Sequence, residues 1–307
     1  MNMGRQRALW LAAFALLAAG CAAQSREPAD TSGNRCAPAR PFAEGGERAT
    51  LWIRQSAEYR AASEIIYRAA GAALARNLTD SGLSADPAQT SGYSELPPAV
   101  VMDIDDTVLD NSAPQARMIL EHICPAEFPA VWDAWVGERA APGVPGAAAF
   151  VRVARAMQDP RGRPVRVFFI TNRECSPRTG KPGACPQEED TLENLRELGL
   201  DAPTLAEDLM MKGERPEWVS EKESRRHEVA RRYRIVLNVG DDFGDFLPGV
   251  RRQDVPARER ARCAHQDWWG TRWFQVPNPM YGSWQAALGP DLEKSLAAPA
   301  APDCPEP

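Results

Sequence analysis

Three short apolar runs, each followed directly by polar or acidic residues, constrain the fold of this chain more than any other feature. The runs span residues 99–102, 165–170 and 235–239. Short runs of this kind, in which valine, isoleucine and phenylalanine recur, predict buried β-strands. Because segments of helical character separate them, we expect a parallel sheet in an α/β fold. Ligands bind beyond the carboxyl ends of such strands, so the residues that follow each run are the candidates for function.

The segments around these strands predict one α/β domain over residues 47–289. A chain of 307 residues, 44% apolar and 25% charged, is long enough to bury a substantial core. Predicted helices start near Leu51 and cover residues 114–122, 129–137, 145–157, 188–198 and 217–232. We expect the N-terminal helix and a helical insertion at about residues 112–145 to form a smaller region over the rim of the site. The alanine- and proline-rich tail, residues 290–307, is expected to be loose.

The charge distribution argues against a nucleic acid polymer as a partner. The chain carries 36 basic and 42 acidic residues, a net charge of −6, and no basic run breaks that balance. Its three histidines are few for a histidine-rich metal site. We expect His227 and the adjacent pairs Arg225-Arg226 and Arg231-Arg232 to lie on a solvated helix face.

The first twenty residues have the pattern of a signal peptide. Arg5 and Arg7 precede a twelve-residue apolar run, which is too short to span a bilayer. Small residues directly before Cys21 resemble a bacterial lipobox, so Cys21 is the predicted lipidation site, and residues 21–46 are a predicted flexible tether. Because Ala22 follows the cysteine, we expect an exported lipoprotein of the outer membrane, on its periplasmic side or at the cell surface. An ordinary cleaved signal with an incidental Cys21 is the alternative.

Export permits disulfides. Six further cysteines remain, and the most favourable local bridge joins Cys175 to Cys185 around a loop that contains proline and glycine. The sequence does not fix the other pairings, and several of these thiols could stay free. The spacing Cys-x-x-Cys does not occur, which argues against a zinc knuckle.

Carboxylates gather where the predicted strands end. Asp103 and Asp105 follow the first run, Thr171 and Asn172 follow the second, and Gly240 leads into the acidic stretch after the third, which holds Asp241, Asp242 and Asp245. Acids that converge in this way repel each other unless a cation neutralises them, and hard oxygen ligands favour Mg²⁺. A metal beside a spare carboxylate suits phosphoryl transfer, in which the carboxylate attacks phosphorus.

A calcium-binding EF-hand loop is the other interpretation of the acids from Asp103 onward. That loop requires glycine at its sixth position and glutamate at its twelfth. Val108 and Pro114 occupy these positions, so the sequence argues against calcium binding alone.

The motifs resemble those of the haloacid dehalogenase (HAD) superfamily, and more closely the bacterial class C acid phosphatases, surface lipoproteins with a four-aspartate signature. The resemblance runs from about Trp52 to Trp284. Its motifs are Asp-Ile-Asp-Asp-Thr-Val-Leu-Asp-Asn from Asp103, Gly-Asp-Asp-Phe-Gly-Asp-Phe from Gly240, the strand end at Thr171 and a lysine on the following helix. The resemblance implies a Rossmann-like core with a central parallel sheet and a smaller helical cap.

The resemblance also implies roles for individual residues. Asp103 would be the nucleophile, and Asp105 would be the general acid and then the general base. Thr171, with the Asn172 amide, would bind a phosphoryl oxygen, and Lys222 would neutralise charge on the transferred group. Lys212 is the alternative to Lys222, because it also lies between the second and third predicted strands.

The same resemblance implies a metal site for Mg²⁺. Asp241 would bind the ion together with Asp103 and the backbone carbonyl of Asp105. Asp245 would orient metal-bound water or Lys222.

The activity implied is Mg²⁺-dependent hydrolysis of phosphomonoesters, including a 5′-nucleotidase activity on nucleoside 5′-monophosphates, in a possible homodimer. The aromatic residues are expected to pack in the core or to stack on a nucleobase; they are Trp52, Tyr59, Trp132, Trp135 and Tyr281. Two other classes remain open. One is a lipoprotein that captures haem or a nucleotide without chemistry, and the other is a phosphotransferase that uses an acceptor alcohol in place of water.

Overall fold

The computed structural model describes residues 40–301 and 303–304. The predicted signal peptide, Cys21 and most of the predicted tether lie outside this range. Helix α1 (Arg40–Gln55) begins within the stretch predicted as tether. Among the described residues, no helix combines the length and the apolar character needed to cross a membrane.

Five parallel strands form one sheet in the order β3-β2-β1-β4-β5, which confirms the predicted α/β fold. The strands are β1 (Pro98–Met102), β2 (Arg166–Glu174), β3 (Leu209–Lys212), β4 (Arg234–Gly240) and β5 (Trp273–Gln275). The three predicted strands are the three central ones. The edge strands β3 and β5 were not predicted. They have only four and three residues, which is too short for a recognisable pattern of apolar residues.

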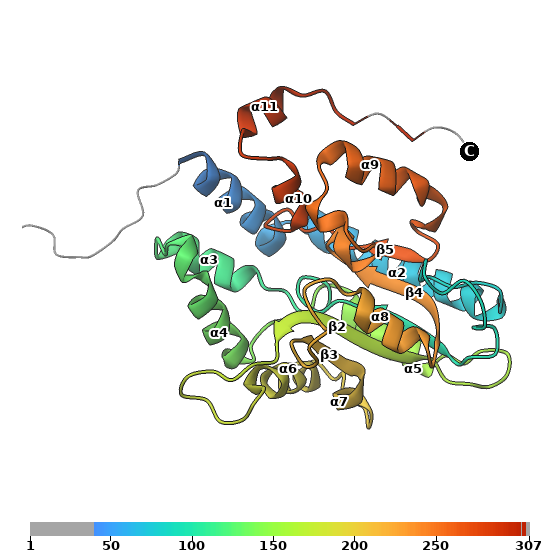
Figure 1. Ribbon diagram of the computed structural model, residues 1–307. Coiled ribbons are helices and arrows are strands. Elements are labelled where there is room, and N and C mark those ends of the chain that lie inside the picture. The colour runs from blue at the N-terminus through green and yellow to red at the C-terminus, as the bar shows by residue number, and fades with distance from the viewer. Residues whose placement is uncertain (1–39, 302, 305–307) are drawn as a thin grey trace, which may run out of the picture. The chain divides into compact units, whose positions relative to one another are not determined.

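Helices lie on both faces of this sheet (Figure 1). After α1 they are α2 (Ala57–Thr79), α3 (Ser112–Leu120), α4 (Phe128–Glu138), α5 (Ala147–Ala156), α6 (Pro186–Glu197), α7 (Leu205–Asp208), α8 (Glu223–Ala230), α9 (Val255–Ala264), α10 (Ser283–Ala287) and α11 (Leu292–Ala297). The predicted N-terminal helix is divided at Ser56, whose hydroxyl caps α2 by accepting the N–H of Tyr59. Helix α8 begins six residues later than predicted, because the chain turns where Trp218 bonds back to Arg215.

The alternation of side chains along the strands builds two hydrophobic clusters, one on each face. On β1, Val100 and Met102 pack into the cluster that includes residues of α2, α5 and α6. Ala99 and Val101 point to the opposite cluster, which includes Phe246 and residues that flank α8. Burying a large apolar side chain stabilises the fold by about 1.5–3 kcal/mol, so both faces hold the sheet in place.

Two disulfides join described cysteines. Cys175 bonds Cys185, which confirms the predicted local bridge. Cys263 on α9 bonds Cys304. The prediction of a loose C-terminal tail is wrong for this stretch, because α11 forms within it and Cys304 is tied to α9.

The prediction of a solvated arginine face on α8 is also wrong in part. Arg231, Arg232 and His227 are exposed, but Arg225 and Arg226 are 0% and 2% exposed. Their guanidinium groups donate hydrogen bonds to backbone carbonyls at the strand ends, including the carbonyls of Thr171 and Asp245. These bonds pair part of each guanidinium group and so lower the cost of burying its charge.

Candidate active site

The site lies where the strand order reverses, between β1 and β4. Asp103 follows β1, and its N–H donates to the carbonyl of Val239 on β4. Asp241 follows β4 directly. With Asp245, these two aspartates place one carboxylate oxygen each within 4.8 Å of the others, and all three side chains are buried. The structure therefore brings together the acids predicted at the ends of two separate strands.

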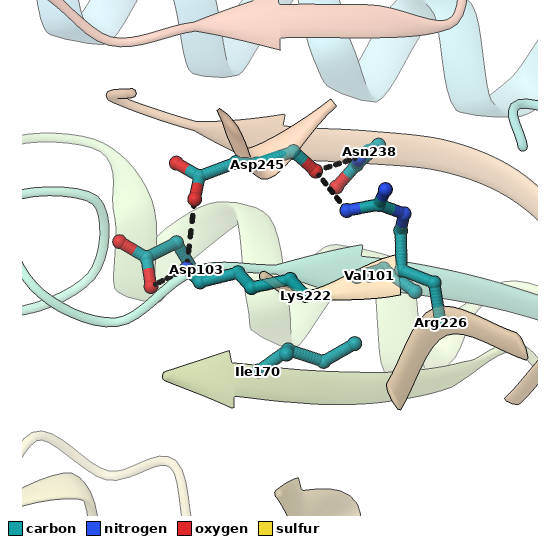
Figure 2. A pocket seen from close by; sticks show the side chains of 7 residues that line it. All are labelled: Val101, Asp103, Ile170, Lys222, Arg226, Asn238 and Asp245. Carbon is teal, nitrogen blue, oxygen red and sulfur yellow. Dashed lines mark hydrogen bonds and ion pairs between the residues drawn. The ribbon is translucent and has the colours of Figure 1, made fainter. Parts of the chain in front are cut away.

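Lys222 inserts its ammonium group into this cluster (Figure 2). Its Nζ contacts Asp103 Oδ1 and lies 2.8 Å from Asp245 Oδ1, and the residue is 3% exposed. It occupies the N-cap position of α8. Lys212, the alternative lysine, is on β3 and pairs with Glu174 at 3.1 Å. Of the two candidates, Lys222 is the one that the fold places against Asp103.

The cluster carries more negative than positive charge. Burial raises the pKa of the Asp103 carboxyl to about 7, even though Lys222 acts in the opposite direction. Burial and the neighbouring carboxylates of Asp103 and Asp245 raise the pKa of Asp241 well above its usual value. Burial opposes the charge of Lys222, but Asp103 and Asp245 outweigh it and raise the pKa of that lysine. Lys222 and Arg251, whose guanidinium lies 3.5 Å from Asp245 Oδ1, are the cationic side chains beside these three carboxylates. A cation bound among them would lower the remaining repulsion.

Asp241 is held by neutral donors. The Thr107 hydroxyl donates to Asp241 Oδ1 at 3.2 Å, and the Asn278 side chain donates to Oδ2 at 2.8 Å. Asp245 is bound differently, since its Oδ2 accepts the backbone N–H of Asp242 and its Oδ1 pairs with Lys222. Among the described residues, no cationic side chain pairs directly with Asp241.

The predicted phosphate-binding residues lie at the end of β2. The hydroxyl of Thr171 donates to Asp105 Oδ2 at 2.9 Å, so these two predicted residues meet. The Asn172 side chain binds elsewhere: its Oδ1 accepts from Arg225 and its Nδ2 donates to the carbonyl of Ser220. This leaves the backbone N–H as the candidate donor at position 172.

A further set of residues around the aspartates was not predicted from the sequence in these roles. Arg226 and Asn238 both donate to the backbone carbonyl of Asp245, at 2.8 and 2.9 Å (Figure 2). Tyr281 donates its hydroxyl to Asp106, whose backbone turns through a left-handed conformation with φ of 57°. The sequence had indicated Tyr281 only as an aromatic residue that would pack in the core or stack on a nucleobase, not as a partner of Asp106.

Comparison with known proteins identifies the family. Residues 44–284 match the model of the HAD superfamily, subfamily IIIB (acid phosphatase). The chain belongs to this family. Two structures of the class C acid phosphatase from Bacillus anthracis are also similar to it, with TM-scores of 0.62 and 0.63 and 28% and 27% sequence identity. Each match covers 80% of this chain and 89% of the other, and the second structure has tungstate bound.

A cavity of about 1240 Å³ opens onto the aspartates of this acid phosphatase. Asp103, Asp105, Asp241 and Lys222 lie among its lining residues. Its walls are largely apolar and come from two separate segments of the chain: Met118 and Ile119 of α3 with Phe128 and Trp132 of α4, and Tyr281, Trp284, Leu288 and Leu292 near the C-terminus. Residues of α1 line it as well, including Glu47 and Thr50. Trp52 and Tyr59 instead pack edge to face, with ring centroids 5.4 Å apart.

We expect Gly240→Ala to lower the rate of phosphomonoester hydrolysis by at least about tenfold, because small displacements of catalytic groups are costly. A Cβ at this position would lie 2.5 Å from the Cβ of Asp245 and 2.8 Å from its Cγ. Asp245 would have to move, and Lys222 with it. Hydrolysis of p-nitrophenyl phosphate measures the effect.

Gly71→Ala is the matched control, because its new Cβ would meet nothing within 4 Å on helix α2. That variant should keep its activity and gain up to about 1 kcal/mol of stability from the better helix former. Full activity in Gly240→Ala would contradict the close packing of Asp245 against β4.

Proposed function

We propose that this acid phosphatase is a Mg²⁺-dependent phosphomonoesterase that forms an aspartyl-phosphate on Asp103. The observation that carries the proposal is the buried juxtaposition of Asp103, Lys222 and Asp241 at one end of β1 and β4. Asp105 lies two residues beyond the nucleophile and touches Thr171. A nucleophile, a second carboxylate for proton transfer and a buried cation are the groups that this reaction needs.

The residues present fit a hard divalent cation. The three carboxylates supply only oxygen donors, and the raised pKa values of Asp103 and Asp241 indicate unmatched negative charge. Asp103, Asp241 and the backbone carbonyl of Asp105 would hold Mg²⁺, while Asp245 is engaged with Lys222. When bound, Mg²⁺ would screen the negative charge of the phosphate group.

The side chains carry out nucleophilic attack, proton transfer and stabilisation of the phosphoryl group. A carboxylate oxygen of Asp103 attacks phosphorus as the bond to the leaving oxygen breaks, and Asp105 protonates that oxygen. Lys222, Thr171 and the Asn172 backbone N–H stabilise the phosphoryl oxygens. Asp105 then takes a proton from the water that attacks the aspartyl-phosphate. The tungstate in the Bacillus anthracis enzyme supports this proposal, because tungstate is a tetrahedral oxyanion like phosphate.

The cavity supports nucleoside 5′-monophosphates as substrates. It is far larger than a phosphate group and carries aromatic side chains on two walls. Phe128 and Trp132 lie with ring centroids 5.8 Å apart on one wall, and Tyr281 and Trp284 line the other. The flat base of a nucleoside leaving group would stack there while the phosphate reached the aspartates.

We expect Asp103→Asn to lower phosphate release from p-nitrophenyl phosphate and AMP by about 10³-fold or more, because an amide cannot form the covalent intermediate. Asp201→Asn, an exposed aspartate beside Arg196, is the matched control and should keep full activity. Colorimetric phosphate release in Mg²⁺, from acidic to neutral pH, measures both. If the wild-type protein released no phosphate from either ester, the proposal of a general phosphatase would be wrong.

We expect EDTA to abolish hydrolysis and excess Mg²⁺ to restore it. Asp241→Asn should then need more Mg²⁺ for half-maximal activity, because one of two buried carboxylate ligands is lost. Titration of the metal-depleted enzyme with Mg²⁺, followed by activity and by calorimetry, tests this. Unchanged activity after exhaustive chelation would contradict a metal-dependent site.

We also propose that the protein is an exported lipoprotein anchored through Cys21 at the outer membrane, where it would release phosphate and nucleosides from external esters. The supporting observation is the run of small residues before Cys21 behind a short apolar segment. Cys21→Ser should abolish incorporation of labelled fatty acid and move the protein from the membrane to the soluble fraction. Ser25→Ala is the control and should do neither. Fatty acid label that persists in Cys21→Ser would refute the anchor.

A further inference from the structure

The two oxygens of the Asp105 carboxylate have different surroundings. Oδ1 accepts two hydrogen bonds from fixed donors: Arg173 Nε at 2.9 Å and Asn111 Nδ2 at 3.0 Å. Oδ2 accepts one, from the hydroxyl of Thr171. A hydroxyl can rotate towards another acceptor, whereas an amide or guanidinium N–H cannot leave without moving the side chain. Oδ1 is therefore anchored and Oδ2 is free to change partners.

Trp135 fixes the orientation of the Asn111 side-chain amide. Trp135 Nε1 donates to Asn111 Oδ1 at 2.8 Å, and an indole N–H can only donate. The amide oxygen of Asn111 must therefore face Trp135, and its NH₂ group must face Asp105. Asn111 is 0% and Trp135 is 5% exposed, so water does not compete for either group.

Arg173 is held just as firmly. Its NH1 donates to the hydroxyl of Thr191 on α6 at 3.0 Å, and its side chain is 1% exposed. Its guanidinium lies 5.7 Å from the ring centroid of Trp132. The two donors to Oδ1 thus come from the loop after β1 and from the end of β2. Asn111 is held by α4, and Arg173 contacts both α4 and α6.

We propose that Asn111, oriented by Trp135, is a positioning residue that holds Oδ1 of Asp105 so that Oδ2 is the oxygen that exchanges protons during hydrolysis. This inference rests on the proposed function. In the first step, Asp103 forms a bond to phosphorus, the bond to the leaving oxygen breaks, and that oxygen takes the proton of Asp105 Oδ2. In the second step, water attacks phosphorus, its proton passes to Oδ2, and the Asp103–phosphorus bond breaks to release phosphate.

The test compares two esters with different leaving groups. Proton donation by Asp105 matters most when the departing alkoxide is strongly basic. The two substrates are p-nitrophenyl phosphate, whose leaving group departs readily without a proton, and 2-phenylethyl phosphate, whose alkoxide does not. Both carry a phenyl ring for the cavity. kcat/KM is measured for each ester, since it reports the steps up to the loss of the leaving group.

Asn111→Ala should lower kcat/KM for 2-phenylethyl phosphate at least about tenfold more than for p-nitrophenyl phosphate. Trp135→Phe keeps a ring in place but removes the indole N–H, and should show the same selectivity to a smaller degree. Trp273→Phe is the matched control: its Nε1 donates to the carbonyl of Ala85 at 2.7 Å, in the cluster on the opposite face of the sheet. It should affect both esters equally.

Equal losses on both esters in Asn111→Ala and Trp135→Phe would overturn the inference and leave the phosphatase assignment standing. A wild-type protein that hydrolyses neither ester would overturn both. Thermal denaturation of each variant identifies a loss of folding, and in that case Trp135→Phe, the smaller change, decides between the outcomes.

Discussion

The ion pairs of Lys222 with Asp103 and Asp245 are the interaction on which the rest of the site depends. They join the N-cap of α8 to the residues that follow β1 and β4, and all three side chains are buried. Removing one partner of a buried ion pair costs roughly 3–5 kcal/mol, because the remaining charge loses its compensation. The lysine therefore holds the residues after two strands together while it partly neutralises the charge of Asp103, the proposed nucleophile. Lys222 and Arg251 together do not balance the three carboxylates, and this imbalance makes the site suited to a further cation.

Helix α8 supports this arrangement beyond its N-cap. Arg225 reaches the carbonyl of Thr171 on β2, and Arg226 reaches the carbonyl of Asp245 after β4. Lys222, Arg225 and Arg226 thus lie within one five-residue segment. Their side chains bind residues at or after the ends of β1, β2 and β4. The carboxylate of Asp105, the proposed general acid, is held separately by Asn111 and Arg173, which contact residues of α4 and α6. Asp103 and Asp105 thus bind different side chains, although they lie only two positions apart in the chain.

The sequence predicted the parts of this site that follow from strand topology. Acids after two apolar runs had to meet, because the carboxyl ends of neighbouring parallel strands share one edge of a sheet. It could not predict the burial of Arg225 and Arg226, since a charged helix looks the same whether its cations face water or backbone carbonyls. Nor could it predict β3 and β5, whose few residues pair only because the central strands offer an edge. The roles of Asn111 and Trp135 were hidden for another reason: their contact joins residues 24 positions apart across the insertion.

The disulfide between Cys263 and Cys304 bears on the cavity as well as on the tail. Leu288 and Leu292, which form part of the apolar wall, lie inside the loop that this bond closes. For a sequence separation of 41 residues, closing such a loop lowers the entropy of the unfolded chain by the equivalent of about 4 kcal/mol. The C-terminal part of the cavity wall thus lies within a covalently closed loop. The aspartate cluster, in contrast, is held by ion pairs and hydrogen bonds. In an oxidising compartment, the disulfide would therefore stabilise the part of the cavity wall that would contact the leaving group. It would do so independently of the aspartates, which would act on the phosphate.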